Sequence, residues 1–357
     1  MDPRPARTRV LYHHPVRTDD FDYHLPEDRI AQRPVRRGTS RLLVLDRGRG
    51  ATEHRRIGEL PDLLDGDDLL LLNDTRVIPA RLEARRPTGR RFELLLLREI
   101  GDGDWECLLR PSARGRAGER LRLTDGTEVE LIGPRGEGRW TIRFDPRLEL
   151  ERLEALGETP LPPYIRRESG PVPEDRTDYQ TVYAAVPGAI AAPTAGLHFT
   201  RELLDRIDER GIERAFVTLH VGIGTFRPVS AECVSDHRMH SEWYRFPETA
   251  ARSVNRALAD RRRVVCVGTT TVRALEGALA VGRGRVVSGD AWTDIFITPG
   301  FEFKGVGALL TNFHLPRSTL LMLVSALAGR ARVLAAYDEA IAAGYRFFSY
   351  GDAMLIV

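Results

Sequence analysis

The chain has 357 residues, of which 42% are hydrophobic and 29% are charged, and its formal net charge is +2. This composition indicates a globular protein that buries a sizeable core and is long enough for two domains. It excludes a membrane-spanning chain, because no apolar run approaches the required length. The small net charge also gives no global field that would indicate a nucleic-acid partner.

The first residues of the chain are polar, contain proline and lack the apolar segment of a secretory signal. We therefore expect a flexible extension over 1–20 and a cytoplasmic protein. The three cysteines, Cys107, Cys233 and Cys266, lie far apart and show no CxxC spacing. We interpret them as small buried hydrophobic residues rather than as a disulfide framework or a thiolate zinc site.

The first predicted elements in chain order are strands. The run RLLVL at 41–45 indicates a buried strand, and short apolar or alternating runs bounded by Gly, Asp and Pro follow between about 68 and 145. The pair Asp125-Gly126 between two alternating runs predicts a hairpin. Strands at this spacing, with no helical pattern between them, are typical of a small β-barrel or sandwich.

The rest of the chain alternates helices and strands. A short helix ends before a proline-rich linker near 160, and an amphipathic helix begins at the candidate N-cap Thr200 and stops at Gly211. Further strands are expected at 214–222 and 263–268, and further helices at 247–262, 269–280, 317–329 and 331–344. The predicted fold class is α/β, with a larger α/β domain formed by both chain ends (21–67 and 157–357) and an inserted β-barrel-like domain at 68–156.

A strand, a tight turn at Gly268 and a helix that starts with three threonines form the first candidate binding motif. The hydroxyls and backbone N–H groups of Thr269, Thr270 and Thr271 would offer an anion site for a carboxylate or phosphate at the helix N-terminus. Simple N-capping is the alternative, but it needs only one threonine.

Two glycine-containing loops each carry a histidine. Thr194 and His198 lie in APTAGLHFT just before a helix, and His220 ends a strand that leads into the loop with Thr225. A lone strand histidine is more often a satisfied core residue than a catalyst. Two such histidines beside glycine loops favour a cleft.

The segment DHRMHSEWY contains His237, His240 and Glu242, a set that suits zinc or iron by residue type. It lacks the HExxH pattern, so polar substrate binding or a structural network is the favoured interpretation.

Among 53 basic residues, Lys304 is the one lysine, and it precedes a loop that holds Asn312 and His314. Lysine can lose its proton where arginine cannot, so this stretch is a candidate site. Asn73 and Arg76 lie at the entry to the inserted domain, where Arg76 could hold an anion or pair with Asp74.

Arginines gather in two stretches of the inserted domain and suit phosphate contacts, with a solvated face as the alternative interpretation. The candidates for phosphate contact are Arg85, Arg86, Arg114, Arg116 and Arg120.

At these residues the sequence resembles a known family. The strings NDTRVIPARL, APTAGLHFT, VTLHVGIGTF, VGTTTVRALE, TNFHLPRSTLLMLVSA and YRFFSYGDAMLIV are similar to those of the S-adenosylmethionine:tRNA ribosyltransferase-isomerases of queuosine synthesis, and the resemblance runs from Phe21 to Val357. APTAGLHFT together with TNFHLPRSTLLML is highly specific for this family.

The resemblance implies transfer of the ribosyl part of S-adenosylmethionine to 7-aminomethyl-7-deazaguanine at the wobble position of tRNA. Isomerisation of the ribose would give epoxyqueuosine, with release of adenine and methionine. S-adenosylmethionine is then a co-substrate rather than a bound cofactor, no metal is expected, and the tRNAs are those for tyrosine, histidine, asparagine and aspartate. We expect a monomer with no membrane partner.

This chemistry needs a base beside the sulfonium, an acid for the departing adenine and a neutral amine, which favours groups that titrate near neutrality. We assign acid and base roles to His198, His220, His240, Glu242, Lys304 and His314. We assign substrate binding to Asn73, Arg76, Thr194, Thr225, Thr269, Thr270, Thr271, Arg273 and Asn312. Two alternatives are a metal-dependent hydrolase using His237, His240 and Glu242, and a non-catalytic RNA-binding protein using the arginine clusters.

Overall fold

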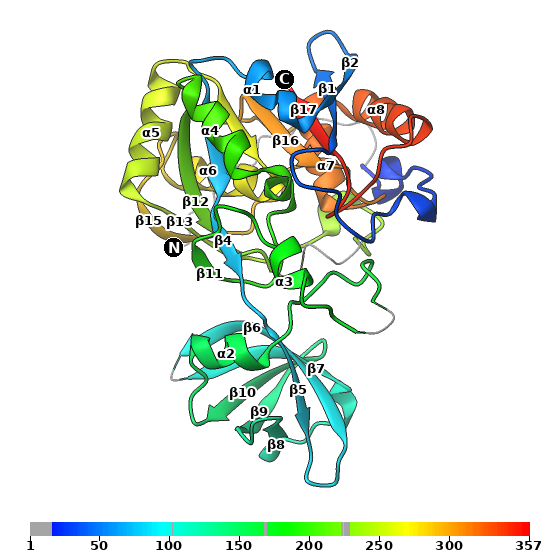
Figure 1. Cartoon of the computed structure of the whole chain (residues 1–357), viewed down its shortest axis with the longest axis vertical. Coiled ribbons are helices and arrows are strands. Elements are labelled where there is room, and N and C mark those ends of the chain that lie inside the picture. Colours follow the sequence, from blue (N-terminus) through cyan, green and yellow to red (C-terminus); the bar gives the residue numbers. More distant parts are fainter. Residues whose placement is uncertain (1–15, 102, 168–169, 223, 225–228) are drawn as a thin grey trace.

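The structure is a computed structural model and describes residues 16–101, 103–167, 170–222, 224 and 229–357. An α/β domain and a smaller β-barrel lie one above the other along the longest axis of the molecule (Figure 1). This arrangement confirms the predicted fold class.

A nine-stranded mixed sheet forms the centre of the α/β domain, in the order β15-β13-β12-β3-β14-β16-β17-β1-β2. Its strands are β1 (Arg41–Asp46), β2 (Ala51–Arg56), β3 (Leu69–Asn73), β12 (Glu213–Leu219), β13 (Glu242–Phe246), β14 (Val264–Val267), β15 (Gly289–Thr293), β16 (Ala308–Asn312) and β17 (Ala353–Ile356). β3 pairs in parallel with both β12 and β14, and β14 pairs in parallel with β16.

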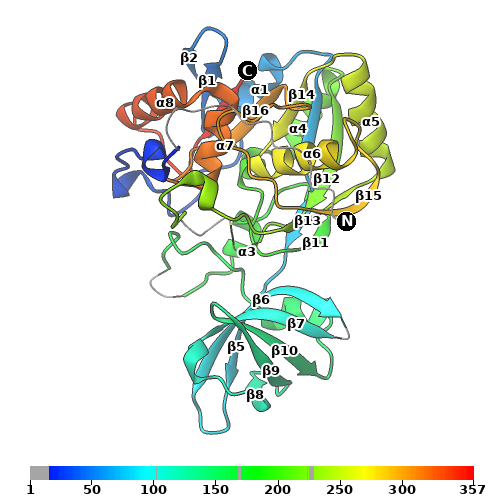
Figure 2. The same ribbon diagram turned by 180° about the vertical axis from the view of Figure 1, so that it is seen from behind.

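Helices cover both faces of this sheet, which gives three layers (Figures 1 and 2). They are α1 (Leu60–Leu63), α4 (Arg201–Glu209), α5 (Glu248–Ala259), α6 (Thr269–Val281), α7 (Thr319–Ala328) and α8 (Arg330–Ala342). The last four pack on one face, and α1 and α4 pack on the other. The central strand β3 is therefore apolar from Leu69 to Leu72: Leu69 and Leu71 face one layer, while Leu70 and Leu72 face the other.

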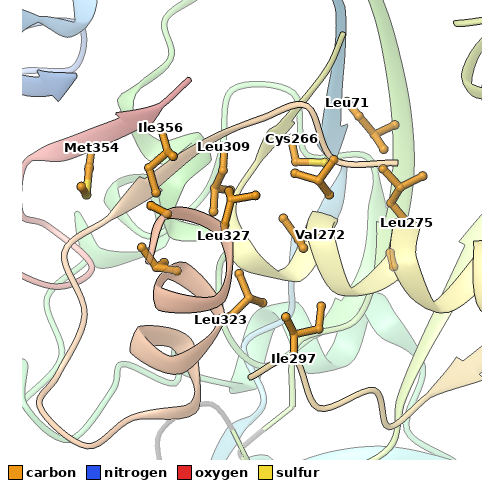
Figure 3. Close-up of a cluster of buried hydrophobic side chains, with 14 of the residues drawn as sticks. Leu71, Cys266, Val272, Leu275, Ile297, Leu309, Leu323, Leu327, Met354 and Ile356 are labelled. Carbon is orange, nitrogen blue, oxygen red and sulfur yellow. The ribbon is translucent and has the colours of Figure 1, made fainter. Parts of the chain in front are cut away.

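The larger of the two buried clusters joins residues that are distant in sequence (Figure 3). Leu71 of β3 and Cys266 of β14 meet Val272 of α6, and Leu323 of α7 lies beside them. Burial of such side chains stabilises the domain by about 1.5–3 kcal/mol each. Cys107 and Cys266 are buried free thiols, as expected, whereas Cys233 is partly exposed.

The smaller domain is a closed six-stranded antiparallel barrel with strand order β10-β7-β6-β5-β8-β9. Its strands are β5 (Arg81–Arg85), β6 (Arg91–Gly101), β7 (Asp104–Arg110), β8 (Glu119–Leu123), β9 (Glu128–Gly136) and β10 (Arg139–Asp145). The hairpin predicted at Asp125-Gly126 joins β8 to β9, and Gly126 takes the left-handed backbone (φ 91°) that this turn requires. Closure leaves no unpaired sheet edge.

Two details of the predicted organisation are wrong. The run Leu69–Asn73, which we assigned to the inserted segment 68–156, is the strand β3 in the middle of the nine-stranded sheet, because its side chains are buried on both faces. The expected flexible extension 1–20 is also too long. Residues 1–15 lie outside the described part, but Thr18–Phe21 form the 3₁₀-helix η1, and the Thr18 N–H donates to Glu232 O at 2.9 Å.

Short elements connect the two domains. β4 (Thr75–Val77) pairs in parallel with β11 (Val186–Ala189), while α2 (Leu150–Leu156) and α3 (Asp175–Asp178) lie on the return path. The remaining 3₁₀-turns are η2 (Glu27–Arg29), η3 (Ile57–Glu59), η4 (Ser112–Arg114), η5 (Thr194–His198) and η7 (Val234–Asp236).

In the described ranges, no single helix is long and apolar enough to cross a membrane. The pair α7 and α8 reaches that length and hydropathy together, but the two helices are bent by 113° at their junction.

The N-cap predicted for α4 is confirmed, since the Thr200 hydroxyl oxygen accepts a hydrogen bond from Leu203 N at 3.1 Å. Thr200→Ala should lower stability by about 1 kcal/mol, because it leaves a helix N–H without its acceptor. Thermal unfolding of the α/β domain should shift downward by roughly 2–4 °C. Thr200→Ser keeps the acceptor and should melt like the wild type; equal melting of the alanine variant would contradict the capping role.

Candidate active site

The parallel pairing of β3, β12, β14 and β16 brings their carboxyl ends to one edge of the sheet. Ligands in open α/β sheets bind in crevices outside these ends. The residues that follow directly are His220 after β12, Gly268 after β14 and Phe313 after β16. Two adjoining cavities open at this edge.

The first, cavity A, is lined by segments from across the chain. Its polar lining comes from the side chains of Tyr164, Tyr179, Thr194, Thr269, Thr270, Thr311, Asn312, His314, Ser318 and Ser349. The second, cavity B, has polar walls made by His237, His240, Glu242, Thr269, Thr270, Arg273 and Thr319. Thr269, Thr270 and Leu320 line both cavities, so a single elongated ligand can contact both.

The three threonines at the start of α6 have different surroundings. Gly268 has a left-handed backbone (φ 92°), which turns the chain from β14 into the helix. Thr269 and Thr270 line the cavities, whereas Thr271 is fully buried and its hydroxyl donates to Val267 O at 2.6 Å. The predicted anion site is therefore reduced to two hydroxyls and the helix N-terminus.

A buried hydrogen-bonded chain runs from Asn312 through His198 to Ser40. The Asn312 amide Nδ2 donates to Phe348 O at 3.0 Å, and this carbonyl fixes which end of the amide is nitrogen. His198 Nε2, 3.3 Å from Asn312 Nδ2, must then accept. The imidazole proton lies on Nδ1 and is donated to Ser40 Oγ at 2.9 Å. His198 does not line either cavity and acts by orienting Asn312.

The other amide atom of Asn312 is free to bind a ligand. Among the described residues, Asn312 Oδ1 is buried without a hydrogen-bond partner, and Asn312 lines cavity A. A buried unpaired acceptor costs about 1–3 kcal/mol, which a ligand N–H or O–H would recover.

His314 is the histidine that lines cavity A. Its Nε2 lies 2.9 Å from Thr311 Oγ1, and its backbone N–H donates to Tyr337 OH at 3.1 Å. Burial lowers the pKa of His314 to about 3, so its ring is neutral at physiological pH. The Tyr23 hydroxyl donates to the His314 carbonyl and fixes this loop from the other side.

The wall of cavity A opposite His314 includes residues that the motif analysis did not select. Tyr164 OH lies 2.7 Å from Ser349 Oγ, and its ring stacks on Phe348 with a centroid distance of 4.8 Å. Phe348 has a positive φ of 70°, a strained conformation for a side chain of this size. The Asn312 hydrogen bond holds it there. For Phe348 and Ser349, the signal in the sequence was the resemblance of the string YRFFSYGDAMLIV to the family.

A buried ion pair forms the base of cavity B. Glu242 on β13 pairs with Arg273 on α6, and its second oxygen accepts from Gly222 N at 3.1 Å. Arg273 also donates to Ile295 O at 3.3 Å and to His240 O at 3.5 Å. Breaking a buried pair leaves an uncompensated charge, so Glu242 holds Arg273 in place, and Arg273 in turn holds the backbone of the exposed His240.

This ion pair also bears on the metal-site alternative. No group of three or more His, Cys, Asp or Glu among the described residues could hold a metal ion. The Glu242 carboxylate is occupied by Arg273 and Gly222.

Two predicted site residues do not line the cavities themselves. Asn73 is fully buried; its amide bonds to Leu219 O and Leu219 N, and its Nδ2 lies 3.4 Å from Thr270 Oγ1, so it joins β3 to β12 and supports the start of α6. Arg76 pairs with Glu154 of α2 at 2.8 Å and not with Asp74. Thr225 lies outside the described residues.

The sequence predicted that Lys304 lies with Asn312 and His314, but the structure places it elsewhere. Its side chain is exposed and lines neither cavity, while its backbone N–H donates to the buried Glu276 at 3.0 Å. The extended strand β16 (Ala308–Asn312) separates Lys304, which precedes its first residue, from Asn312, its last residue, so the two lie toward opposite ends of this strand. The structure therefore gives no support to a catalytic lysine, and that role stays a prediction.

His220 also lies apart, in a cleft between the two domains. Its Nδ1 is 2.8 Å from Thr75 Oγ1, and its ring stacks on Trp243 at 4.6 Å. Burial, with a smaller effect of the nearby Arg245, lowers its pKa to about 4.

Many of the barrel arginines form ion pairs with acidic residues, which their clustering in the sequence did not indicate. Residues 81–145 contain fourteen arginines and twelve acidic residues. Arg85 pairs with Glu83 of its own strand β5. Arg86 pairs with Glu119 and Arg120 with Glu128, because neighbouring strands bring these acids close. Arg114 and Arg116 are exposed.

Comparison with known proteins identifies the family. The pattern of the family described as "Queuosine biosynthesis protein" matches residues 18–356. The S-adenosylmethionine:tRNA ribosyltransferase-isomerase of Thermus thermophilus is 52% identical over 94% of this chain and 98% of its own length. That of Trichlorobacter lovleyi is 51% identical over 95% and 99%. The crystal structure of the Thermotoga maritima S-adenosylmethionine tRNA ribosyltransferase has 38% identity and a TM-score of 0.54, over 95% of this chain and 100% of that one.

The chain belongs to the S-adenosylmethionine:tRNA ribosyltransferase-isomerase family of queuosine biosynthesis. The resemblance inferred from the sequence motifs is confirmed, as is the expectation of an enzyme.

The buried histidines predict how stability depends on pH. Burial, with a smaller effect of Arg346, lowers the pKa of His198 from 6.5 to about 4. Between these values the unfolded state binds the proton and the folded state does not, so stability falls as the pH decreases from about 6.5 to 4. His198 alone accounts for roughly 3 kcal/mol of this loss. Urea unfolding of His198→Gln should show a shallower decline than the wild type.

The matched control is the exposed His24. His24→Gln should keep the wild-type pH dependence. An unchanged slope in His198→Gln would show that His198 is charged in the folded state, against the neutral Nδ1–H tautomer.

Proposed function

We propose that the chain transfers and isomerises the ribosyl moiety of S-adenosylmethionine onto 7-aminomethyl-7-deazaguanine at the wobble position of tRNA, giving epoxyqueuosine with release of adenine and methionine. The family membership supports this reaction class. The observation that supports a location for this reaction is the pair of adjoining cavities at the carboxyl edge of the parallel strands. Thr269 and Thr270 line both cavities.

The donor is an elongated molecule with a nucleoside at one end and an amino-acid carboxylate at the other, which suits two joined cavities. We assign its carboxylate to Thr269, Thr270 and the N-terminus of α6, where hydroxyls, N–H groups and the helix dipole favour an anion. Asn312 Oδ1 supplies a buried acceptor for an N–H or O–H group of a substrate.

Acid and base roles are proposed for the histidines on the cavity walls. His314 in cavity A is neutral, so its ring has an unprotonated nitrogen that can accept a proton from the substrate, and His240 is the exposed histidine on the wall of cavity B. His198 and Glu242 act as positioning residues through Asn312 and Arg273.

The acceptor is proposed to be a tRNA for tyrosine, histidine, asparagine or aspartate, bound by a monomer in the cytoplasm. The exposed Arg114 and Arg116 of the barrel support phosphate contact. The direct test is mass spectrometry of tRNA that carries the precursor base after incubation with the protein and S-adenosylmethionine. Absence of the mass of epoxyqueuosine would overturn the proposal.

Thr269→Val removes a cavity hydroxyl at nearly constant volume. It should weaken S-adenosylmethionine binding about tenfold or more, because a hydrogen bond to a charged group is removed, with little change in tRNA affinity. Calorimetric titration with the donor measures this. Thr249, an exposed threonine in the first turn of α5, provides the control Thr249→Val. If Thr269→Val binds S-adenosylmethionine with wild-type affinity, the donor carboxylate binds elsewhere.

Arg114→Ala combined with Arg116→Ala should weaken tRNA binding at low salt. The slope of log K against log salt should fall by roughly 1 for each phosphate that the variant no longer neutralises. Donor affinity should stay the same. Arg49, exposed at the β1–β2 turn far from the barrel, serves as the control site (Figure 1). An unchanged salt slope in the double variant would exclude these residues from the tRNA interface.

A further inference from the structure

A cleft between the barrel and the β13–β15 edge of the sheet is not used by the proposed chemistry. Three of the chain's four tryptophans line it: Trp105 from β7, Trp243 from β13 and Trp292 from β15. His220, Arg98 and Arg135 complete its walls. We call it the tryptophan cleft.

The ring of Trp292 is exposed at the surface of this cleft rather than buried in a core. The Trp292 side chain is among the few large apolar groups with substantial exposure, at 51%. The Arg98 guanidinium, whose Nε pairs with Glu106 at 2.9 Å, lies over its ring at 5.7 Å from the centroid. Trp243 on the paired strand β13 lies directly across from Trp292 in the strand register, and the ring of His220 is stacked on it. Flat aromatic faces beside guanidinium groups are the combination that binds a nucleobase and its phosphate.

One residue that lines this cleft has a hydrogen-bond donor without an acceptor in the part of the chain that the structure describes. Among the described residues, the indole Nε1 of Trp105 is buried and has no hydrogen-bond acceptor. An unpaired buried donor is costly, and an acceptor on a ligand in this cleft would remove the cost. Base edges and phosphate oxygens are both rich in acceptors.

The acidic groups around the cleft are already matched by arginines. Glu99 pairs with Arg147 at 2.6 Å. Asp290 pairs with Arg245, whose guanidinium lies over Trp243 at 5.2 Å from the ring centroid. The carboxylates therefore oppose an incoming phosphate less than unpaired acids would.

Two stretches of backbone carry residues that line the cleft close to residues that line cavity A. His220 lines the cleft and the next residue, Val221, lines the cavity. Gly188 lines the cleft and Ala191 lines the cavity, and Ala191 bridges to Val221. Adjacent Cα atoms are about 3.8 Å apart, so a ligand in the cleft lies within a nucleotide's reach of the cavity.

We propose that the tryptophan cleft binds an unpaired nucleotide next to the modified base, with its base stacked on Trp292 and its phosphate near Arg98 and Arg135. The inference rests on the proposed function, since it assumes an RNA substrate whose target base enters the cavities. Extrusion of a base is how enzymes reach a base for chemistry, and a stacking platform for its neighbour offsets the lost stacking in the RNA.

The test uses the full-length protein and an anticodon stem–loop RNA that carries the precursor base. Trp292→Ala should weaken binding of this RNA by roughly 5- to 100-fold, the range for loss of one stacked base. Trp292→Phe should retain most of the affinity, because it keeps an aromatic face. Val287, exposed just before β15, gives the control Val287→Ala, which should bind like the wild type.

A duplex RNA of the same stem without the loop separates stacking from general charge attraction. Its affinity should be equal for the wild type and Trp292→Ala. An equal loss on both RNAs, or unchanged affinity for the stem–loop in a variant that melts like the wild type, would overturn the nucleotide-binding role of the cleft.

Ribosyl transfer at saturating RNA distinguishes this proposal from the proposed function. If the wild-type protein modifies the stem–loop and Trp292→Ala binds this RNA as tightly as the wild type, only the nucleotide-binding role of the cleft is refuted. Wild-type protein without any transfer would refute the proposed function and, with it, the assumption on which the cleft proposal rests.

Discussion

The parallel hydrogen bonding of β3 to both β12 and β14, continued from β14 to β16, is the constraint on which the rest of the structure depends. It points four strands in one direction, so that their carboxyl ends and the loops after them meet at a single edge. Asn73 secures this pairing by bonding to both backbone groups of Leu219. This strand pairing sets the positions of the turn at Gly268, the start of α6 and the loop after β16.

Burial gives the polar groups at this edge their chemical state. His198 is kept neutral by desolvation and has both ring nitrogens occupied, so it fixes Asn312 and leaves Oδ1 of that amide without a partner. Glu242 and Arg273 remain charged only because they compensate each other. The groups nearest the cavities are thus held by others, and preorganisation of this kind lowers the cost of ordering a substrate.

The barrel contributes through its position rather than its net charge. Its arginines are largely matched by acids on the same or adjacent strands, yet it faces the β13–β15 edge and forms a cleft with aromatic walls beside cavity A. Two domains built from one chain therefore present to a substrate both an enclosed site and an open approach to it.

The sequence by itself determined the α/β class, the inserted barrel, the hairpin at Asp125-Gly126, the cap at Thr200 and the family, because local periodicity, turn residues and motif strings carry this information. Tertiary structure alone decided which polar residues meet. It brought Tyr164 and Ser349 to cavity A, placed Asn73 behind the cavity residue Thr270, placed the side chain of Lys304 outside both cavities, and paired Arg120 with Glu128. The physical reason is that side-chain neighbours across a sheet are set by long-range strand order and register, which no local pattern encodes.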